Sequence, residues 1–310
     1  MENNLRREWA IIRNPKAGGG KSIAIWPVFR NCLHHAGFHF KEYLTKEVGH
    51  ATLLGKKLVE QGYRNFIAFG GDGTLNEVLN GLAAQTFVDC SELTLTQFPS
   101  GTGNDWCRAH HIPEKVEHFV KFLLNAECIR QDIGLLTIQS SSHQRYFINV
   151  AGAGFDAYTG NIVNQKKSKN KLSYLSSLLQ GLLSYKDVEL QVYSEGKEIF
   201  YAEAFSLILG ICPFFGNGMK PCPKAVFDDG LLDVTLVKKI GKGKLISLLP
   251  RLYKGKLEAL KEVNLFTSRF IEVKTNSNTY IQLDGEVVGS GSFTVQILEK
   301  HIQILTQKNT

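Results

Sequence analysis

The chain has 310 residues, of which 43% are hydrophobic and 21% are charged, the composition of an ordinary globular protein with ample core material. Its net charge of +7 suits an anionic partner (a nucleotide, a nucleic acid or an acidic membrane surface) without choosing among them. The best apolar runs, 172–183 and 204–215, fall short of the ~20 residues that a membrane-spanning helix needs, so any membrane role must be peripheral.

The cysteines and the N-terminus both indicate a cytoplasmic protein. None of the six cysteines forms a CxxC pair, and no cluster of histidine and cysteine has the spacing of a zinc site. The opening segment MENNLRREW lacks the apolar stretch of a signal peptide. We therefore expect reduced thiols.

The first 130 residues alternate between short apolar strands and helical patterns. Strands are predicted at 9–13, 38–44, 65–69 and 93–98, and helices from about residue 21, at 49–61 and at 74–82. This repetition predicts an open α/β sheet whose ligand loops lie at the carboxyl ends of the strands.

From about residue 132 the pattern changes to successive short strands. They are predicted at 135–139, 145–150, 188–193, 203–209, 231–237, 270–274, 280–283 and 293–298. Two helical insertions interrupt them, near 171–184 and 244–260. This half is therefore predicted to be an antiparallel, sandwich-like second domain.

One glycine-rich loop, Gly70-Gly71-Asp72-Gly73-Thr74, stands between an apolar strand and a helix. Glycines let main-chain N–H groups face a bound anion, and the helix N-terminus adds a favourable dipole, so phosphate is the expected ligand. Asp72 would be badly placed beside phosphate unless a cation such as Mg²⁺ bridged the two. The alternative is a glycine-rich turn in which Asp72 is a cap.

Two more polar loops, 14–20 and 99–105, follow the first and fourth predicted strands. In an open α/β sheet, loops at the same strand ends converge on one crevice. The sequence contains neither a Walker A loop nor a GxGxxG fingerprint in the first turn, so a nucleotide site of another kind is predicted.

These loops and later motifs resemble, in order, the signature of the diacylglycerol kinase catalytic family, which includes bacterial soluble lipid kinases and the sphingosine and ceramide kinases. The matching motifs are Asn14-Pro15-x-x-Gly18, Gly70-Gly71-Asp72-Gly73-Thr74-x-x-Glu77, Pro99-x-Gly101-Thr102-x-Asn104-Asp105, Asp132-Ile133-Gly134, Gly152-x-Gly154-x-Asp156, Asp228-Asp229-Gly230-x-Leu232-Asp233 and Asp284-Gly285-Glu286. The sequence departs at Ala17, where the family usually has serine.

The resemblance implies an N-terminal open α/β nucleotide-binding domain like that of NAD kinase and diacylglycerol kinase, followed by a C-terminal antiparallel β-sandwich. The expected bounds are 1–132 for the ATP-binding domain, with 291–310 returning to it, and 133–290 for the lipid-substrate domain. The active site would lie in the cleft between the two.

The resemblance also implies which residues bind ATP, a substrate of the expected reaction. They are Asn14, Thr45, Gly70, Gly71, Asp72, Gly73, Thr74, Glu77, Gly101, Thr102 and Asn104. For Thr45 a surface helix-cap threonine is the open alternative.

By the same resemblance Glu286 is the general base, with a β-turn glutamate as the alternative. Asp72 is the candidate for the catalytic Mg²⁺ network, and Asp132 and Asp284 would support it. A second Mg²⁺ site would use the Asp229 carboxylate and the main-chain carbonyls of Val226 and Leu231. The alternative there is an Asp-Gly turn entering a strand.

A basic segment precedes an apolar helical pattern that could rest on an anionic membrane and pass lipid to the active site. The same pattern fits a core helix behind a solvated loop. The lysines are Lys166, Lys167, Lys169 and Lys171, and the apolar residues are Leu172, Tyr174, Leu175, Leu178, Leu179, Leu182 and Leu183. Trp26, Phe214, Phe215 and Met219 would contact acyl chains or be buried in the core.

Together these features predict a cytoplasmic, Mg²⁺-dependent kinase that phosphorylates diacylglycerol or a related lipid in phospholipid biosynthesis. It would meet the membrane peripherally at its inner face and would bind no nucleic acid. The alternatives are an NAD kinase and a catalytically silent binding protein for nucleotide or lipid. The oligomeric state stays open, with a homodimer as one option.

Overall fold

The computed structural model describes residues 4–159, 181–182 and 184–307. The chain divides into two compact units, one formed by Met1–Gln131 with Lys300–Thr310 and the other by Asp132–Glu299. We expected the return to the first unit at about residue 291. It begins at Lys300 because residues 293–296 pair with residues 270–273 inside the second unit.

The first unit is built on a parallel sheet. Its strands are β1 (Glu8–Arg13), β2 (His39–Leu44), β3 (Asn65–Gly70) and β4 (Thr94–Pro99), in the order β4-β3-β1-β2, and the end of β15 (Phe293–Thr306) pairs with β4. All these pairings are parallel. β1 and β3 are buried along nearly their whole length, which explains their almost continuous apolar sequences.

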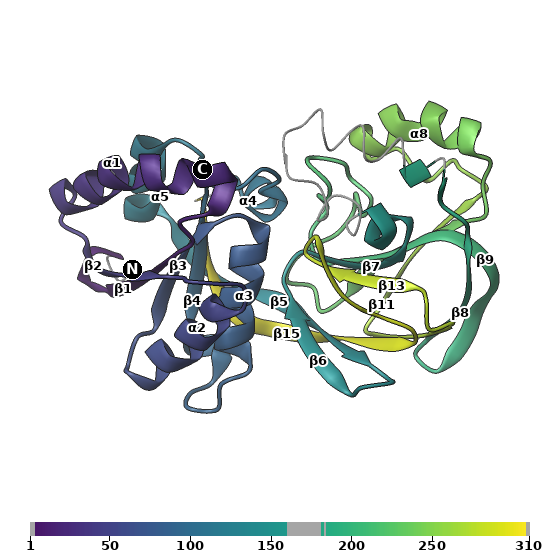
Figure 1. Cartoon of the computed structure of the whole chain (residues 1–310), viewed down its shortest axis with the longest axis horizontal. Helices are drawn as coiled ribbons and strands as arrows, with labels where there is room; N and C mark the ends of the chain where they lie inside the picture. The colour runs from purple at the N-terminus through teal and green to yellow at the C-terminus, as the bar shows by residue number, and fades with distance from the viewer. Residues whose placement is uncertain (1–3, 160–180, 183, 308–310) are drawn as a thin grey trace. The chain divides into compact units, whose positions relative to one another are not determined.

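Helices cover both faces of this sheet (Figure 1). α1 (Lys21–His35) packs beside α5 (Val116–Asn125), and α2 (His50–Glu60) packs beside α3 (Asp72–Ala83). α4 (Asp105–Ala109) and 3-10 turns at Asn4–Arg6, Ala17–Gly20 and Cys90–Glu92 complete the unit. The open α/β class predicted from the sequence is confirmed.

An aromatic cluster forms the core between α1 and the sheet. The ring centroids of Phe29 and Phe69 lie 4.9 Å apart, and those of Phe69 and Phe98 lie 4.7 Å apart. Trp26 packs edge-on against Phe69 at 5.5 Å and is 8% exposed. Of the two outcomes predicted for Trp26, burial in the core is therefore confirmed and contact with acyl chains is not, because the side chain belongs to the core of the first unit.

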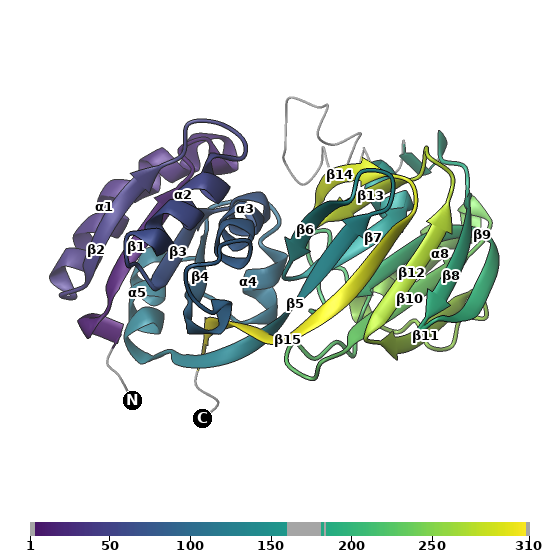
Figure 2. The same ribbon diagram turned by 90° about the horizontal axis from the view of Figure 1, so that it is seen from below.

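The second unit is an antiparallel β-structure, as predicted (Figure 2). Its strands are β5 (Glu127–Ile138), β6 (His143–Phe147), β7 (Val150–Gly154), β8 (Val188–Ser194), β9 (Lys197–Gly210), β10 (Leu232–Lys238), β11 (Val263–Ser268), β12 (Phe270–Thr275), β13 (Tyr280–Leu283) and β14 (Glu286–Ser290). The first half of β9 pairs with β8, whereas the second half pairs with both β7 and β10. β9 therefore joins three strands of this unit through its two halves.

α8 (Lys242–Lys254) connects β10 to β11 and is the later of the two predicted helical insertions. The other insertion lies almost wholly outside the described residues, as do Lys166, Lys167, Lys169 and Lys171. Over the parts of the chain that the structure describes, no helix is long and apolar enough to cross a bilayer. All six cysteines are unpaired.

Candidate active site

Three loops meet at the carboxyl edge of the parallel sheet in the first unit. A Cβ atom on Gly18 would lie 2.1 Å from the carbonyl oxygen of Ser100, and one on Gly101 would lie 2.5 Å from the Cα atom of Gly71. Only glycine permits such close contact between loops. The predicted convergence of the loops after β1, β3 and β4 is therefore confirmed.

Asp72 is the first residue of α3, and the third loop holds its carboxylate. The backbone N–H of Asn104 donates to Asp72 Oδ2 at 2.8 Å, and Asn104 adopts a left-handed conformation with φ of 53°. The N-terminus of a helix of 12 residues adds positive potential at this point. An anion is favoured here by the helix, and a cation is favoured by the carboxylate.

Asn14 connects the first loop to the second. Its backbone N–H donates to the carbonyl of Phe69, and its Nδ2 donates to Thr74 Oγ1 at 3.3 Å. A Cβ atom on Gly70 would lie 2.3 Å from the same Thr74 hydroxyl. The predicted residues Asn14, Gly70 and Thr74 are thus brought together.

Several buried polar atoms around these loops have no hydrogen-bond partner among the described residues. They are Ser22 Oγ, Ser100 Oγ and Asn104 Oδ1. Buried polar groups are normally paired, so unpaired ones beside glycine loops suit a polar ligand. Ser22 and Ser100 were missed from the sequence, although only Lys21 separates Ser22 from the three-glycine turn and Ser100 lies inside the third loop.

Glu77 and Thr45 occupy supporting positions. The carboxylate of Glu77 accepts backbone hydrogen bonds from Gly49 at 2.8 Å and Ala51 at 3.1 Å, so it caps the N-terminus of α2. Thr45 directly follows β2, and its backbone N–H donates to the carbonyl of Arg13 at the end of β1. Thr102, in contrast, is exposed on the third loop. Glu77 therefore holds the segment after Thr45 against α3.

In the second unit, Asp284 anchors the turn between β13 and β14. Its Oδ1 accepts from the N–H groups of Asn149 and Val150, each at 3.0 Å, and its Oδ2 accepts from Ile148 at 3.1 Å. Hydrogen bonds to an ionised carboxylate are stronger than those between neutral groups, and these three fix the turn to the start of β7. The prediction that Asp284 supports the catalytic Mg²⁺ network stays a prediction; the structure shows that Asp284 is bound to the backbone two residues before Glu286, the first residue of β14.

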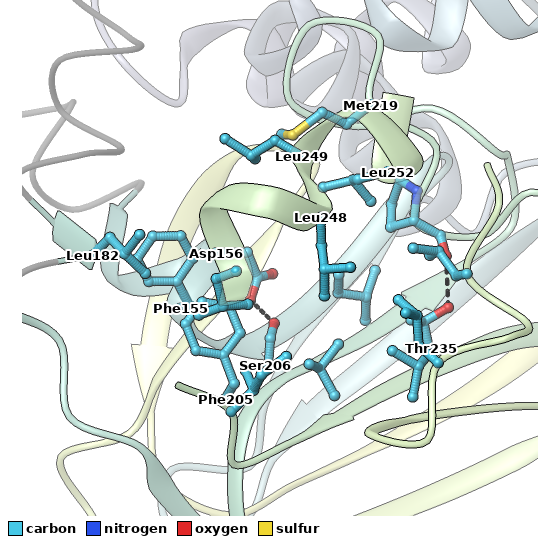
Figure 3. A pocket seen from close by; sticks show the side chains of 18 of the residues that line it. Phe155, Asp156, Leu182, Phe205, Ser206, Met219, Thr235, Leu248, Leu249 and Leu252 are labelled. Atoms are coloured by element: carbon cyan, nitrogen blue, oxygen red, sulfur yellow. Dashed lines mark hydrogen bonds between the residues drawn. The ribbon is translucent and has the colours of Figure 1, made fainter. Parts of the chain in front are cut away.

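An apolar cavity of about 160 Å³ lies in the second unit between α8 and the β9–β10 sheet (Figure 3). Leu248, Leu249 and Leu252 of α8 line one side of it. The predicted acyl contacts Phe215 and Met219 line it as well. Phe214 instead lies beneath the Lys220 ammonium, 5.0 Å from its ring centroid.

The carboxyl of Asp156 lies in the wall of this cavity (Figure 3). Its Oδ1 accepts from the Ser206 hydroxyl at 2.7 Å, and its Oδ2 accepts from Gln282 Nε2 at 3.1 Å. Burial raises the pKa of Asp156. Gln282 Oε1 in turn accepts from the N–H of Gly285 at 2.9 Å. A hydrogen-bonded path therefore runs from the cavity wall to the residue next to Glu286. Asp156 stands in a motif that the sequence revealed, but no role was assigned to it.

Asp132 and Asp229 each accept a hydrogen bond from the backbone of the turn before β10. Asp132 is fully buried and its Oδ2 accepts from the Gly230 N–H at 2.7 Å, whereas Asp229 Oδ1 accepts from Leu231 N–H at 3.0 Å. Burial, together with the charge of Asp229, raises the pKa of Asp233 to about 6. Within the described ranges, no three histidine, cysteine or acidic side chains gather closely enough to hold a metal. A cation at this turn would need main-chain carbonyls as well.

Comparison with known proteins identifies two domains in this chain. Residues 8–136 match the diacylglycerol kinase catalytic domain, and residues 149–306 match the YegS C-terminal NAD kinase beta sandwich-like domain. A protein named diacylglycerol kinase from Staphylococcus saprophyticus is 29% identical over 305 residues, covering 97% of this chain and 96% of its own length. Another of that name, from Staphylococcus epidermidis, is 29% identical over 308 residues and covers 98% and 94%.

Solved structures share the fold. The crystal structure of a diacylglycerol kinase from Bacillus anthracis superposes with a TM-score of 0.74 at 21% identity, over 99% of this chain and 98% of that one. An NAD kinase from Archaeoglobus fulgidus, solved in complex with ATP, gives a TM-score of 0.51 at 13% identity, over 97% and 94%. The protein therefore belongs to the family that joins a diacylglycerol kinase catalytic domain to a YegS-type C-terminal β-sandwich.

Proposed function

We propose that this protein transfers the γ-phosphate of ATP to a lipid hydroxyl, with diacylglycerol as the acceptor. The observation that carries this proposal is the apolar cavity linked through Asp156 and Gln282 to the turn bearing Glu286. Apolar walls with a few polar groups suit hydrocarbon chains that are joined to a group bearing a hydroxyl. The name carried by the Staphylococcus relatives supports this choice of lipid.

ATP would bind at the three loops of the first unit. The close-packed glycines leave main-chain N–H groups open to phosphate, and the N-terminus of α3 favours the negative charge. The unpaired hydroxyls of Ser22 and Ser100 would add donors. The proposed contacts are Asn14, Thr45, Gly70, Gly71, Asp72, Gly73, Thr74, Gly101, Thr102 and Asn104, with Glu77 as a support.

Glu286 would act as the general base. As the lipid hydroxyl oxygen attacks the γ-phosphorus, its proton passes to the Glu286 carboxylate, the bond to the β-phosphate oxygen breaks, and ADP leaves. Asp284 would keep Glu286 in place through its three backbone hydrogen bonds. The path through Gln282 would position the same turn relative to the lipid.

The donor atoms at two places fit Mg²⁺, which prefers oxygen ligands. At the glycine loops, the Asp72 carboxylate is held by the Asn104 N–H where phosphate is expected. A bound cation there would neutralise charge on the triphosphate. At the second place, the Asp229 carboxylate and the carbonyls of Val226 and Leu231 would form a mixed oxygen shell. Asp132 would hold that turn through Gly230.

The two alternatives fit these features less well. If the protein were an NAD kinase, its acceptor would be a polar, charged nucleotide. The leucine-lined cavity disfavours binding of such a molecule. A catalytically silent binding protein would not need a candidate base and a candidate metal ligand, yet the sequence has both Glu286 and Asp72.

The test is transfer of labelled γ-phosphate from ATP to a panel of acceptors with and without Mg²⁺. The panel contains diacylglycerol, monoacylglycerol, ceramide, sphingosine, phosphatidylglycerol, undecaprenol and NAD. We expect labelled diacylglycerol that requires Mg²⁺. Loss of the general base in Glu286→Gln should lower kcat by about 1000-fold.

The matched control is Glu272→Gln, which makes the same change on β12 of the same unit. It should retain wild-type kcat. Label on NAD alone would contradict a lipid acceptor, and wild-type kcat in Glu286→Gln would remove Glu286 as the base.

A further inference from the structure

α8 lies over the apolar cavity and has no fully buried residue along its 13 positions. Leu245, Leu248, Leu249 and Leu252 recur at helical spacing and line the cavity, and the last three are labelled in Figure 3. Its inner face is therefore occupied, and the described part of the chain leaves its remaining faces exposed.

Two other faces of α8 differ in chemistry. Lys244 and Arg251 are seven residues apart, and Lys254 follows three residues later, so the three share one side of the helix. Ile246 and Tyr253 are also seven residues apart and share another side, where they are 47% and 46% exposed, and Ile246 lies at the rim of the cavity, which it helps to line. A basic face beside exposed apolar side chains is the pattern of a helix that lies in a membrane interface.

The charge of the chain is concentrated here. Residues 238–262 contain seven lysines and one arginine against two glutamates, a net charge of +6, whereas the whole chain carries +7. Glu258 pairs with Lys224, outside this segment, and Glu262 pairs with Lys244, so the positive charge of the basic face rests mainly on the exposed Arg251 and Lys254. An anionic partner is therefore favoured at this surface.

We propose that α8 docks this protein on the surface of an anionic lipid bilayer. The basic face would contact the headgroups, while Ile246 and Tyr253 would enter the interface. A nucleic acid would satisfy the basic face alone and leave the apolar side chains against water. The role of this docking rests on the proposed function: a bilayer bound at α8 would bring the lipid acceptor next to the cavity beneath the helix.

The experiment is co-sedimentation of the full chain with phosphatidylcholine vesicles, prepared with and without phosphatidylglycerol. Neither ATP nor diacylglycerol is present, so the outcome is separate from that of the kinase assay. We expect binding that requires phosphatidylglycerol and weakens as salt is added. The double substitution Arg251→Gln with Lys254→Gln should weaken it roughly 30-fold, the effect of two basic residues next to an anionic surface.

The matched control is Lys197→Gln with Lys274→Gln, which removes the same charge from exposed positions on β9 and β12. It should bind vesicles as the wild type does, and thermal unfolding should confirm that both variants are folded. The proposal is overturned if the wild type binds no vesicles, if it binds a nucleic acid duplex instead, or if both double variants lose binding equally. Phosphorylated diacylglycerol without vesicle binding would overturn docking alone.

Discussion

The two units of this protein build their candidate sites in different ways. In the first unit the site is made mainly by the backbone, since Gly18, Gly71 and Gly101 let three loops touch at distances that exclude any side chain. In the second unit the cavity is made by side chains drawn from residues 155 to 263. Each unit should therefore respond to a different kind of substitution.

This difference explains why the two sites were not equally visible in the sequence. A backbone site needs glycine at fixed positions within a few residues, which leaves a short motif. A cavity needs only apolar volume of the right shape, and many side chains can provide it. The first site was therefore recognised in advance, whereas the cavity was represented only by scattered residues, namely Asp156, Leu182, Phe215 and Met219.

The largest effect is expected where a side chain enters the backbone site. In Gly101→Val, a Cβ atom would lie 2.5 Å from the Gly71 Cα atom and 2.9 Å from Asn104 Oδ1. Overpacking of this kind displaces both loops, so affinity for ATP should fall about 100-fold. Titration with a fluorescent ATP analogue measures it.

The control is Gly241→Val, because a Cβ atom at Gly241 meets nothing within 4 Å. It should bind the analogue with wild-type affinity. Equal affinities of the two variants for the ATP analogue would show that the glycine loops tolerate side chains. The distinction between a backbone site in the first unit and a side-chain cavity in the second would then be wrong.

A smaller and more selective effect is expected in the cavity. Leu248→Trp would fill part of the space under α8, so kcat/KM for long-chain diacylglycerol should fall about tenfold while affinity for ATP stays unchanged. Short-chain diacylglycerol should be less affected, because it needs less of the cavity. Steady-state kinetics with a series of chain lengths would check both statements.

Ser247→Trp is the matched control, since Ser247 is the exposed neighbour of Leu248 and does not line the cavity. It should leave the chain-length profile unchanged. A drop in ATP affinity in Leu248→Trp would mean that the two sites are not independent.

The smallest effect concerns stability of the first unit. Burial lowers the pKa of His110, which follows α4, from 6.5 to about 3. At a pH between about 3 and 6.5, His110 is protonated in the unfolded chain but neutral in the folded chain. The free energy of unfolding therefore falls as the pH falls through this range. The loss should be about 2 kcal/mol between about pH 7.5 and about pH 5.

Urea denaturation at both pH values measures this loss. His110→Gln should remove it, whereas His118→Gln, at an exposed position on α5, should retain it. If the free energy of unfolding depends on pH equally in the wild type and in both variants, His110 is protonated in the folded state as well as in the unfolded state.

By itself the sequence determined the class of both units, the strand-loop-helix order of the first, and the three glycine loops. These features depend on local periodicity and on residues close together in the chain. Only the tertiary structure decided that Asp284 binds three backbone N–H groups of residues 148–150, because that contact joins residues more than 130 positions apart. The same holds for the return of β15 at Lys300, for Trp26 in the core, and for the path from Asp156 to Gly285. Contacts at long sequence separation depend on how the strands pair, and periodicity along a single strand carries no information about its partners.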